Sequence, residues 1–171
     1  MEYLHSQGVI HRDIKGANIL AAKEGLVKLA DFGVAVKLNE NEKINSAVGT
    51  PNWSKHFSFI HLLVAPEVIT NSSCVTSACD IWSLGCTILE LLTGQPPYYH
   101  LNQVTAMLKI ANEGLPPLPE NFSPELKDFL GHCFDKEPSK RHTAIELLSH
   151  PWIAQVSSEG TQVCFEQCNK S

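Results

Sequence analysis

The chain has 171 residues, of which 43% are hydrophobic, and it carries a formal net charge of −5 at pH 7. This length fits a single domain, and the acidic balance argues against a nucleic-acid-binding protein. No apolar run approaches the roughly 20 residues needed to cross a membrane, and the start of the chain is too polar for a secretory signal. We therefore expect an intracellular, cytoplasmic protein with no membrane partner. None of the six cysteines forms a C-x-x-C pair, which argues against a zinc site.

The first part of the chain is expected to hold short elements separated by turns. They are a helix at 2–7 that ends at a left-handed Gly8, strands at 19–20 and 27–29, and a turn at 23–25 between these strands. The resulting hairpin would bring Asp31 beside Asn18. From Asp31 to Glu67 the sequence shows no regular pattern, so an irregular segment is predicted there.

The second half of the chain is expected to be helical. Helices are predicted between a cap at Thr76 or Ser77 and Gly94, over 104–110, from Ser123 to Cys133, and after a capping box of Thr143 with Glu146. The first of these is apolar on all sides, which is typical of a buried helix. Its Cys86 is expected to lie in the core together with Cys133. Residues 155–171 are polar and are predicted to form a loose tail.

Two short motifs carry groups that phosphoryl transfer requires. Residues 11–18 read HRDIKGAN, and residues 31–33 read DFG. Phosphoryl transfer needs one carboxylate that orients an incoming hydroxyl, and an amide and a second carboxylate that hold Mg²⁺ against the phosphates. Asp13, Asn18 and Asp31 supply these groups in that order. The sequence APE at 65–67 follows downstream, and the whole set favours phosphoryl transfer over a merely charged loop between two strands.

Together these motifs resemble the carboxy-terminal lobe (C-lobe) of a eukaryotic serine/threonine protein kinase. The resemblance covers residues 3–153. The segments DIWSLGCTILELLTGQPPYY and PPLPENFSPELKDFLGHCF are similar to the Ste group, and within it to epsilon-type mitogen-activated protein kinase kinase kinases and septation-pathway kinases. The resemblance implies a protein kinase-like (α+β) fold, here a mainly α-helical C-lobe with short β-hairpins over residues 1–154.

The same resemblance implies a chemical role for four residues. Asp13 would accept the proton of the substrate hydroxyl. Lys15 would place a positive charge near the transferred phosphoryl group and bind ATP, and a lysine at this position is typical of serine/threonine specificity. Asn18 and Asp31 would bind Mg²⁺, because both offer hard oxygen ligands. ATP and Mg²⁺ are therefore the expected cofactors.

A second set of residues is implied to regulate the loop at residues 11–18, called the catalytic loop from here on. Arg12 precedes the catalytic aspartate, and an arginine there can bind a phosphate on the activation segment. Ser46 stands at the usual position of that phosphate, and a plain loop serine is the alternative. Thr50 resembles the residue that contacts Asp13 and Lys15 in active members.

Other residues are implied to hold the lobe together. Asp80 would accept hydrogen bonds from backbone N–H groups of the catalytic loop, since a buried carboxylate needs such donors. Glu67 and Arg141 resemble an ion pair that locks the activation segment to the lobe. His11 is expected to pack near Phe32 as a structural histidine.

The sequence departs from the family in two places. No glycine-rich loop and no strand lysine precede residue 1, so the ATP-binding amino-terminal lobe (N-lobe) is expected to be missing, which would uncover the helix around Trp82 and Leu89. Residues 54–64 form an atypical insertion before the APE motif, either a lineage-specific insert or a translated intron. We expect an ATP-dependent kinase that phosphorylates Ser or Thr of a protein, such as a downstream kinase in a signalling cascade. The chain itself would lack the N-lobe that completes the ATP-binding site. The alternative is a non-catalytic C-lobe that acts as a protein-binding module.

Overall fold

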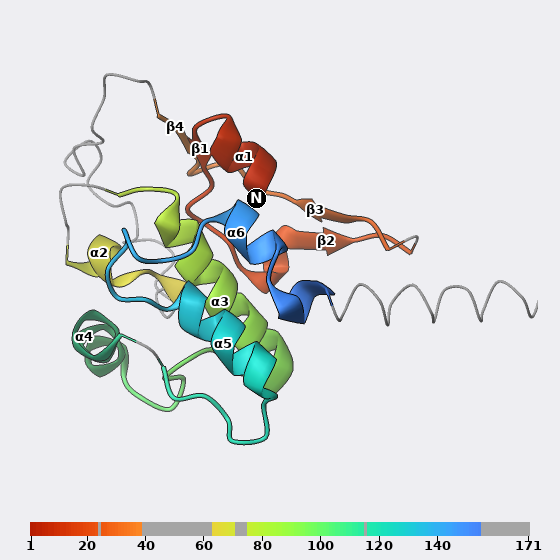
Figure 1. Cartoon of the computed structure of the whole chain (residues 1–171). Coiled ribbons are helices and arrows are strands. Elements are labelled where there is room, and N and C mark those ends of the chain that lie inside the picture. The colour runs from red at the N-terminus through yellow and green to blue at the C-terminus, as the bar shows by residue number, and fades with distance from the viewer. Residues whose placement is uncertain (24, 39–62, 71–74, 115, 155–171) are drawn as a thin grey trace, which may run out of the picture.

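The computed structural model describes residues 1–23, 25–38, 63–70, 75–114 and 116–154. Its elements are α1 (Glu2–Ser6), β1 (Val9–Ile10), the 3₁₀ turn η1 (Gly16–Asn18), β2 (Ile19–Ala21), β3 (Val27–Leu29), β4 (Val36–Lys37), α2 (Pro66–Ile69), α3 (Ala78–Thr93), α4 (Gln103–Glu113), α5 (Pro124–Cys133) and α6 (Ala144–Leu148). The helices pack around α3, and the β2–β3 hairpin extends away from them (Figure 1). The predicted α+β class, mainly α-helical with short strands, is confirmed. The predictions for Ser46, Thr50 and the tail, and nearly all of the insertion, lie outside the described residues.

Among the described residues, four short strands form two antiparallel pairs. β2 pairs with β3, with Leu20 opposite Lys28, so the predicted hairpin is confirmed. β1 pairs with β4, with Ile10 opposite Val36. The prediction of no regular structure between 31 and 67 was therefore wrong at β4 and at α2. A two-residue strand is too short to show a period of two, and β4 depends on backbone pairing with a distant segment.

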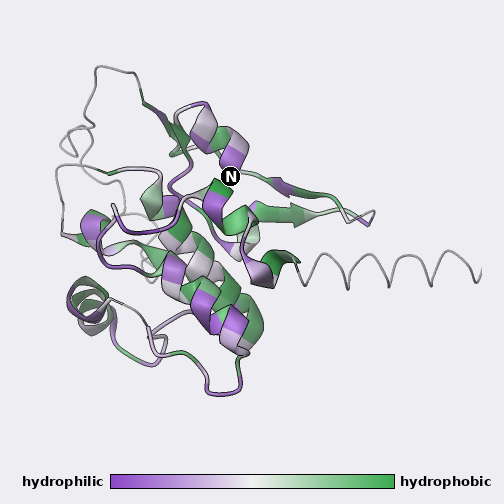
Figure 2. Cartoon of the chain, viewed as in Figure 1, coloured by the Kyte–Doolittle hydropathy of each residue, from purple (hydrophilic) through white to green (hydrophobic). Residues whose placement is uncertain are grey.

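The core is built around α3, along which apolar residues predominate (Figure 2). Trp82 and Leu89 are buried, contrary to the expectation that they would be uncovered. Within α3 the buried residues end at Leu89, because the packing partners cover its first turns. Leu91 and Leu92 in the last turn are 69% and 52% exposed. The prediction of an all-round buried helix was therefore wrong for that turn.

A glycine sets the close approach of α3 and α5. A Cβ atom placed on Gly85 would lie 2.8 Å from Cβ of Cys133 and 3.0 Å from Cζ of Phe134. Cys86 and Cys133 are both buried in the core, as predicted. The two helices can therefore pack at this distance only because position 85 carries no side chain.

Helix ends follow the predicted caps with one correction. The hydroxyl of Ser123 accepts a hydrogen bond from the Leu126 N–H at the start of α5, and the capping box of α6 is present. At α3, Ser77 occupies the cap position but its side chain makes no capping bond. The hydroxyl of Thr76 accepts from the Ala78 N–H instead, because Ser77 has helical backbone angles that turn its side chain away from the first amides.

Among the residues that the structure describes, no helix has both the length and the apolar character needed to cross a bilayer.

Candidate active site

A buried carboxylate holds the backbone of the loop that follows β1. Asp80, 1% exposed, accepts hydrogen bonds of 2.8 Å from the N–H groups of both His11 and Arg12. The Nε2 atom of His5 lies 2.9 Å from the same carboxylate. Arg12 has a φ of 64°, a left-handed conformation that costs a residue with a Cβ free energy. The two amides converge on Asp80 and stabilise that conformation.

The ring of His11 connects this loop to the segment after β3. Its Nδ1 accepts a hydrogen bond from the Asp13 N–H at 3.3 Å, and its Nε2 lies 3.2 Å from the carbonyl oxygen of Ala30. With Nδ1 as acceptor, Nε2 carries the proton and donates to that carbonyl. The ring centroid lies 4.8 Å from that of Phe32. His11 therefore packs against Phe32 as expected.

Three predicted site residues meet at one carboxylate oxygen. Oδ2 of Asp13 accepts hydrogen bonds from Nζ of Lys15 at 2.8 Å and from Nδ2 of Asn18 at 2.9 Å. Nδ2 of Asn18 also donates to the Asp13 carbonyl oxygen at 2.8 Å. These contacts are possible because η1 turns the chain back on itself after Lys15. Oδ1 of Asp13 accepts no hydrogen bond from the described residues, so it is available to a hydroxyl.

The fourth predicted residue follows the hairpin. The Ala30 N–H donates to the Asn18 carbonyl oxygen at 2.9 Å, which ties the end of β3 to η1 and brings Asp31 next to Asn18 in space. Asp31 is exposed, has a φ of 61°, and accepts the Gly33 N–H on Oδ1. Its left-handed backbone directs the chain into the 31–33 turn.

The donor chemistry of these residues fits Mg²⁺. Because Nδ2 of Asn18 faces Asp13, its Oδ1 is the free acceptor of that amide. This oxygen and the carboxylate of Asp31 are hard ligands, and Mg²⁺ prefers such ligands in small number and completes its shell with water. Asn18 and Asp31 would therefore be the residues that hold the ion.

The other predicted residues make their hydrogen bonds outside the group formed by Asp13, Lys15 and Asn18. Nε of Arg12 donates to the Val34 carbonyl oxygen at 2.6 Å, and the side chain is otherwise exposed. The guanidinium of Arg141 donates to both carboxylate oxygens of Glu67, at 2.8 and 3.1 Å, and to the Ala78 carbonyl oxygen. The expected Glu67–Arg141 ion pair is thus present. Ser46 and Thr50, the proposed partners of the catalytic loop, lie outside the described residues.

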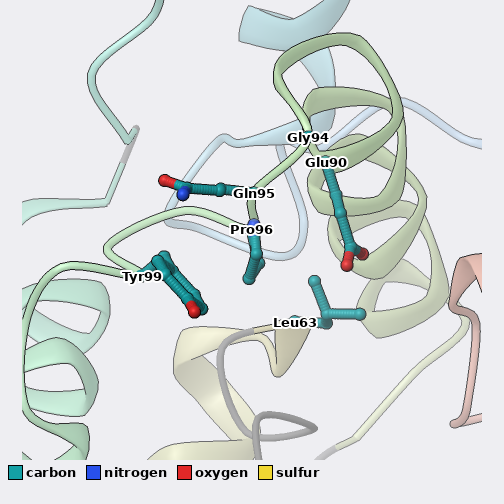
Figure 3. Close-up of a pocket in the computed structure, with 6 residues that line it drawn as sticks. All are labelled: Leu63, Glu90, Gly94, Gln95, Pro96 and Tyr99. Carbon is teal, nitrogen blue, oxygen red and sulfur yellow. The ribbon is translucent and has the colours of Figure 1, made fainter.

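Two pockets on the described surface do not include the four motif residues. One, of about 250 Å³, opens beside the end of α3 and is lined by Leu63, Glu90, Gly94, Gln95, Pro96 and Tyr99 (Figure 3). The other, of about 430 Å³, lies between α2, α4 and residues 136–139. Sequence reasoning missed both pockets, and it missed His5 as the third partner of Asp80. A contact across 75 positions leaves no local signal.

Comparison with known proteins places these observations in a family. Residues 1–153 match the family described as the protein kinase domain. The chain is 57% identical over 152 residues to MAP3K epsilon protein kinase 1 of Brassica napus, covering 88% of this chain and 11% of that protein. It is 57% identical over 151 residues to cytokinesis protein sepH of Aspergillus niger (88% and 10%). It is 52% identical over 151 residues to cell division control protein 7 of Schizosaccharomyces pombe (88% and 13%).

The chain spans about a tenth of the length of these relatives. The resemblance to epsilon-type and septation-type kinases, which residues 80–99 and 116–134 carried, is confirmed. One loop holds a carboxylate, a lysine and an amide, and the protein kinase family matches nearly the whole length of the chain. The chain therefore belongs to the protein kinase family and is a serine/threonine kinase by family.

Proposed function

We propose that the protein containing this chain transfers the γ-phosphoryl group of ATP to a Ser or Thr hydroxyl of a protein substrate. The observation that carries the proposal is the convergence of Lys15 and Asn18 on one oxygen of Asp13. Asp80 fixes the backbone of the same loop by accepting hydrogen bonds from two of its N–H groups. A base and a cation held this close by a rigid loop match what phosphoryl transfer requires.

Each residue has a task that follows from its contacts. Asp13 has one oxygen bound to Lys15 and Asn18, so its other oxygen would accept the proton of the incoming hydroxyl. Lys15 would stabilise negative charge on the transferred group. Its side chain is only 22% exposed, so it is already partly removed from water. Bound Mg²⁺ supplies charge neutralisation on the phosphates. Asn18 and Asp31 would hold that ion in place.

The substrate class is part of the proposal. One relative's name contains MAP3K, and two others are named for cytokinesis and cell division. We propose that the whole protein phosphorylates other proteins, including a downstream kinase in a signalling cascade. Arg12, with an exposed guanidinium, would bind a phosphate on Ser46, and Thr50 would contact the Asp13–Lys15 pair. Glu67 and Arg141 would fix the end of the same segment.

The test is a kinase assay on the full-length protein with Mg²⁺-ATP and a generic Ser/Thr substrate. Asp13→Asn should lower kcat by about 10²–10⁴, because the positioned base is lost. Asp31→Asn should lower activity and raise the Mg²⁺ concentration needed for half-maximal rate. His100→Gln, an exposed change away from the site, serves as the control and should leave the rate unchanged.

The same assay separates the catalytic proposal from the binding-module alternative. Equal phosphate incorporation by the parent protein and by Asp13→Asn would overturn the catalytic proposal. If both proteins then retained the same partner in a pull-down, the chain would act by binding alone.

A further inference from the structure

Three side chains with metal-binding atoms converge on the side of α5 that faces the end of α6. They are Asp128, His132 and His150, and one ligand atom from each lies within 4.8 Å of the others. Asp128 and His132 stand four positions apart on α5, so they share a face of that helix. His150 follows α6 and approaches from the opposite side. None of the three contacts the catalytic loop, so any function they have is separate from phosphoryl transfer.

The carboxylate of Asp128 lies at a distance from each histidine that is close to the spacing of ligands in a metal site. Oδ2 of Asp128 lies 3.2 Å from Nε2 of His150, and Oδ1 lies 3.8 Å from Nε2 of His132. Ligands around a tetrahedral Zn²⁺ with bonds of about 2.0–2.1 Å are roughly 3.3 Å apart. The Asp128 and His132 side chains are 66% and 37% exposed, so small rotamer changes can close the remaining gap. Two imidazoles and a carboxylate with an open fourth position form a ligand set that zinc uses.

We propose that Asp128, His132 and His150 bind one Zn²⁺ ion, with water as the fourth ligand. The absence of cysteine pairs does not bear on this site, because its ligands come from histidine and aspartate. The ion would add a link between α5 and the segment after α6, which the hydrogen bond between His150 and Asp128 and the ring contacts of Phe129 with His150 and Trp152 already join. Zinc would then cross-link these two segments at the carboxy-terminal end of the described residues.

One contact sets a cost for zinc binding. Nδ1 of His150 accepts a hydrogen bond from the Trp152 N–H at 3.2 Å, so Nε2 carries the ring proton and donates to Asp128. Zinc at Nε2 requires the proton of the neutral ring to move to Nδ1, and a proton on Nδ1 breaks the Trp152 bond. The Trp152 amide is therefore a direct reporter of zinc at His150.

A fourth histidine positions one ligand without belonging to the site. The ring of His142 stacks on that of His132, with centroids 3.8 Å apart and planes at 29°. Two stacked rings present their nitrogens in parallel planes, so they do not converge on one ion. His142 would restrict the orientation of the His132 ring.

The test is a titration of the chain with ZnCl₂ in competition with a chromophoric zinc indicator. One equivalent of Zn²⁺ should bind. His132→Gln and Asp128→Asn should each weaken binding by about tenfold or more, since even outer-shell partners of metal sites are worth that much. Both residues are exposed enough for these variants to fold, whereas His150 is 7% exposed and is left unchanged. His100→Gln, an exposed histidine elsewhere, is the matched control and should bind zinc as the parent does.

A second measurement locates the ion independently. In an amide NMR spectrum of the chain, zinc should shift the Trp152 resonance, and His132→Gln should reduce that shift at the same zinc concentration. Unchanged zinc affinity in both His132→Gln and Asp128→Asn would overturn the proposal. An equal loss in His100→Gln would do so as well, because binding would then be spread over surface histidines.

Discussion

Arg141 binds Glu67 through two parallel hydrogen bonds, although 74 positions separate the two residues in the chain. The pair is almost fully buried, with side-chain exposures of 0% and 4%. The guanidinium also lies 5.2 Å from the centroid of the Trp82 ring. The ion pair thus connects the short helix α2 to the core around α3.

Removing one partner of this pair should be costly. Arg141→Met is expected to lower the free energy of unfolding by about 3–5 kcal/mol, because the Glu67 carboxylate would remain buried without its cation. Urea unfolding followed by circular dichroism would measure this. The matched control is Lys109→Met, which breaks an exposed i,i+4 pair with Glu113 and should cost less than about 0.5 kcal/mol. Similar losses for the two variants would contradict the assignment of a buried, structural pair.

The contact between α3 and α5 predicts opposite effects for two glycines. Gly85→Ala should destabilise the fold by about 1–3 kcal/mol, because the new methyl group overlaps Cys133 and Phe134. Gly131→Ala, in the last turn of α5 with open space around its Cβ position, should stabilise it by about 0.5–1 kcal/mol. Thermal unfolding of both variants tests the packing directly, and equal shifts in Tm would show that the helices do not approach closely at Gly85.

The support that Asp80 gives to the catalytic loop can be measured by hydrogen exchange. In Asp80→Asn one carboxylate oxygen becomes an NH₂ group, so either His11 or Arg12 loses its acceptor. The exchange of that amide should accelerate by about tenfold or more, given the usual cost of an unsatisfied buried donor. The Thr105 amide, capped by Asn102, should keep its rate and serves as the internal reference.

The buried cysteines should be chemically inert in the folded chain. Burial raises the pKa of the Cys133 thiol to about 12, and burial likewise raises the pKa values of the Cys79 and Cys86 thiols well above the usual range. Since only the thiolate reacts readily, these three residues should be labelled by iodoacetamide only after unfolding, which mass spectrometry of peptides would show. These raised pKa values also stabilise the fold below pH 9, and that contribution should decline as the pH rises further.

The capping box of α6 predicts an acid-sensitive contribution. The backbone N–H of Thr143, followed by its hydroxyl, holds the pKa of Glu146 below its usual value. A lowered folded-state pKa stabilises the protein above the unfolded pKa of about 4.5, and this stabilisation is lost as the pH falls through the folded value. Glu146→Gln should therefore unfold with a weaker dependence on pH below 4.5. An unchanged pH dependence would show that the capping bonds do not favour the charged form.

Local chemistry explains why much of the site could be predicted. The caps at Ser123 and Thr143 depend on neighbouring residues, and the proposed roles of Asp13 and Asn18 were predicted from a motif of eight positions. The residues that meet at Asp13 are close in sequence, so a short turn suffices to join them.

The rest depends on distant segments. The pairing of β4 with β1, the contact of His5 with Asp80, and the convergence of His150 on α5 all join residues whose own neighbours carry no sign of the partner. The exposure of Leu91 likewise depends on which distant segments pack on the last turn of α3, and the apolar pattern of α3 alone does not contain that information.

The reliance of the catalytic loop on Asp80 also has a consequence for how the protein is made. Asp80 follows His11 by 69 positions, so at a translation rate of 5–20 residues per second the loop is synthesised roughly 3 to 14 s before its acceptor exists. During that interval the His11 and Arg12 amides lack the Asp80 carboxylate that holds Arg12 in its left-handed conformation in the folded chain. Residues 11–18 are thus synthesised early but acquire the geometry seen in the folded chain late, when α3 has formed and docked.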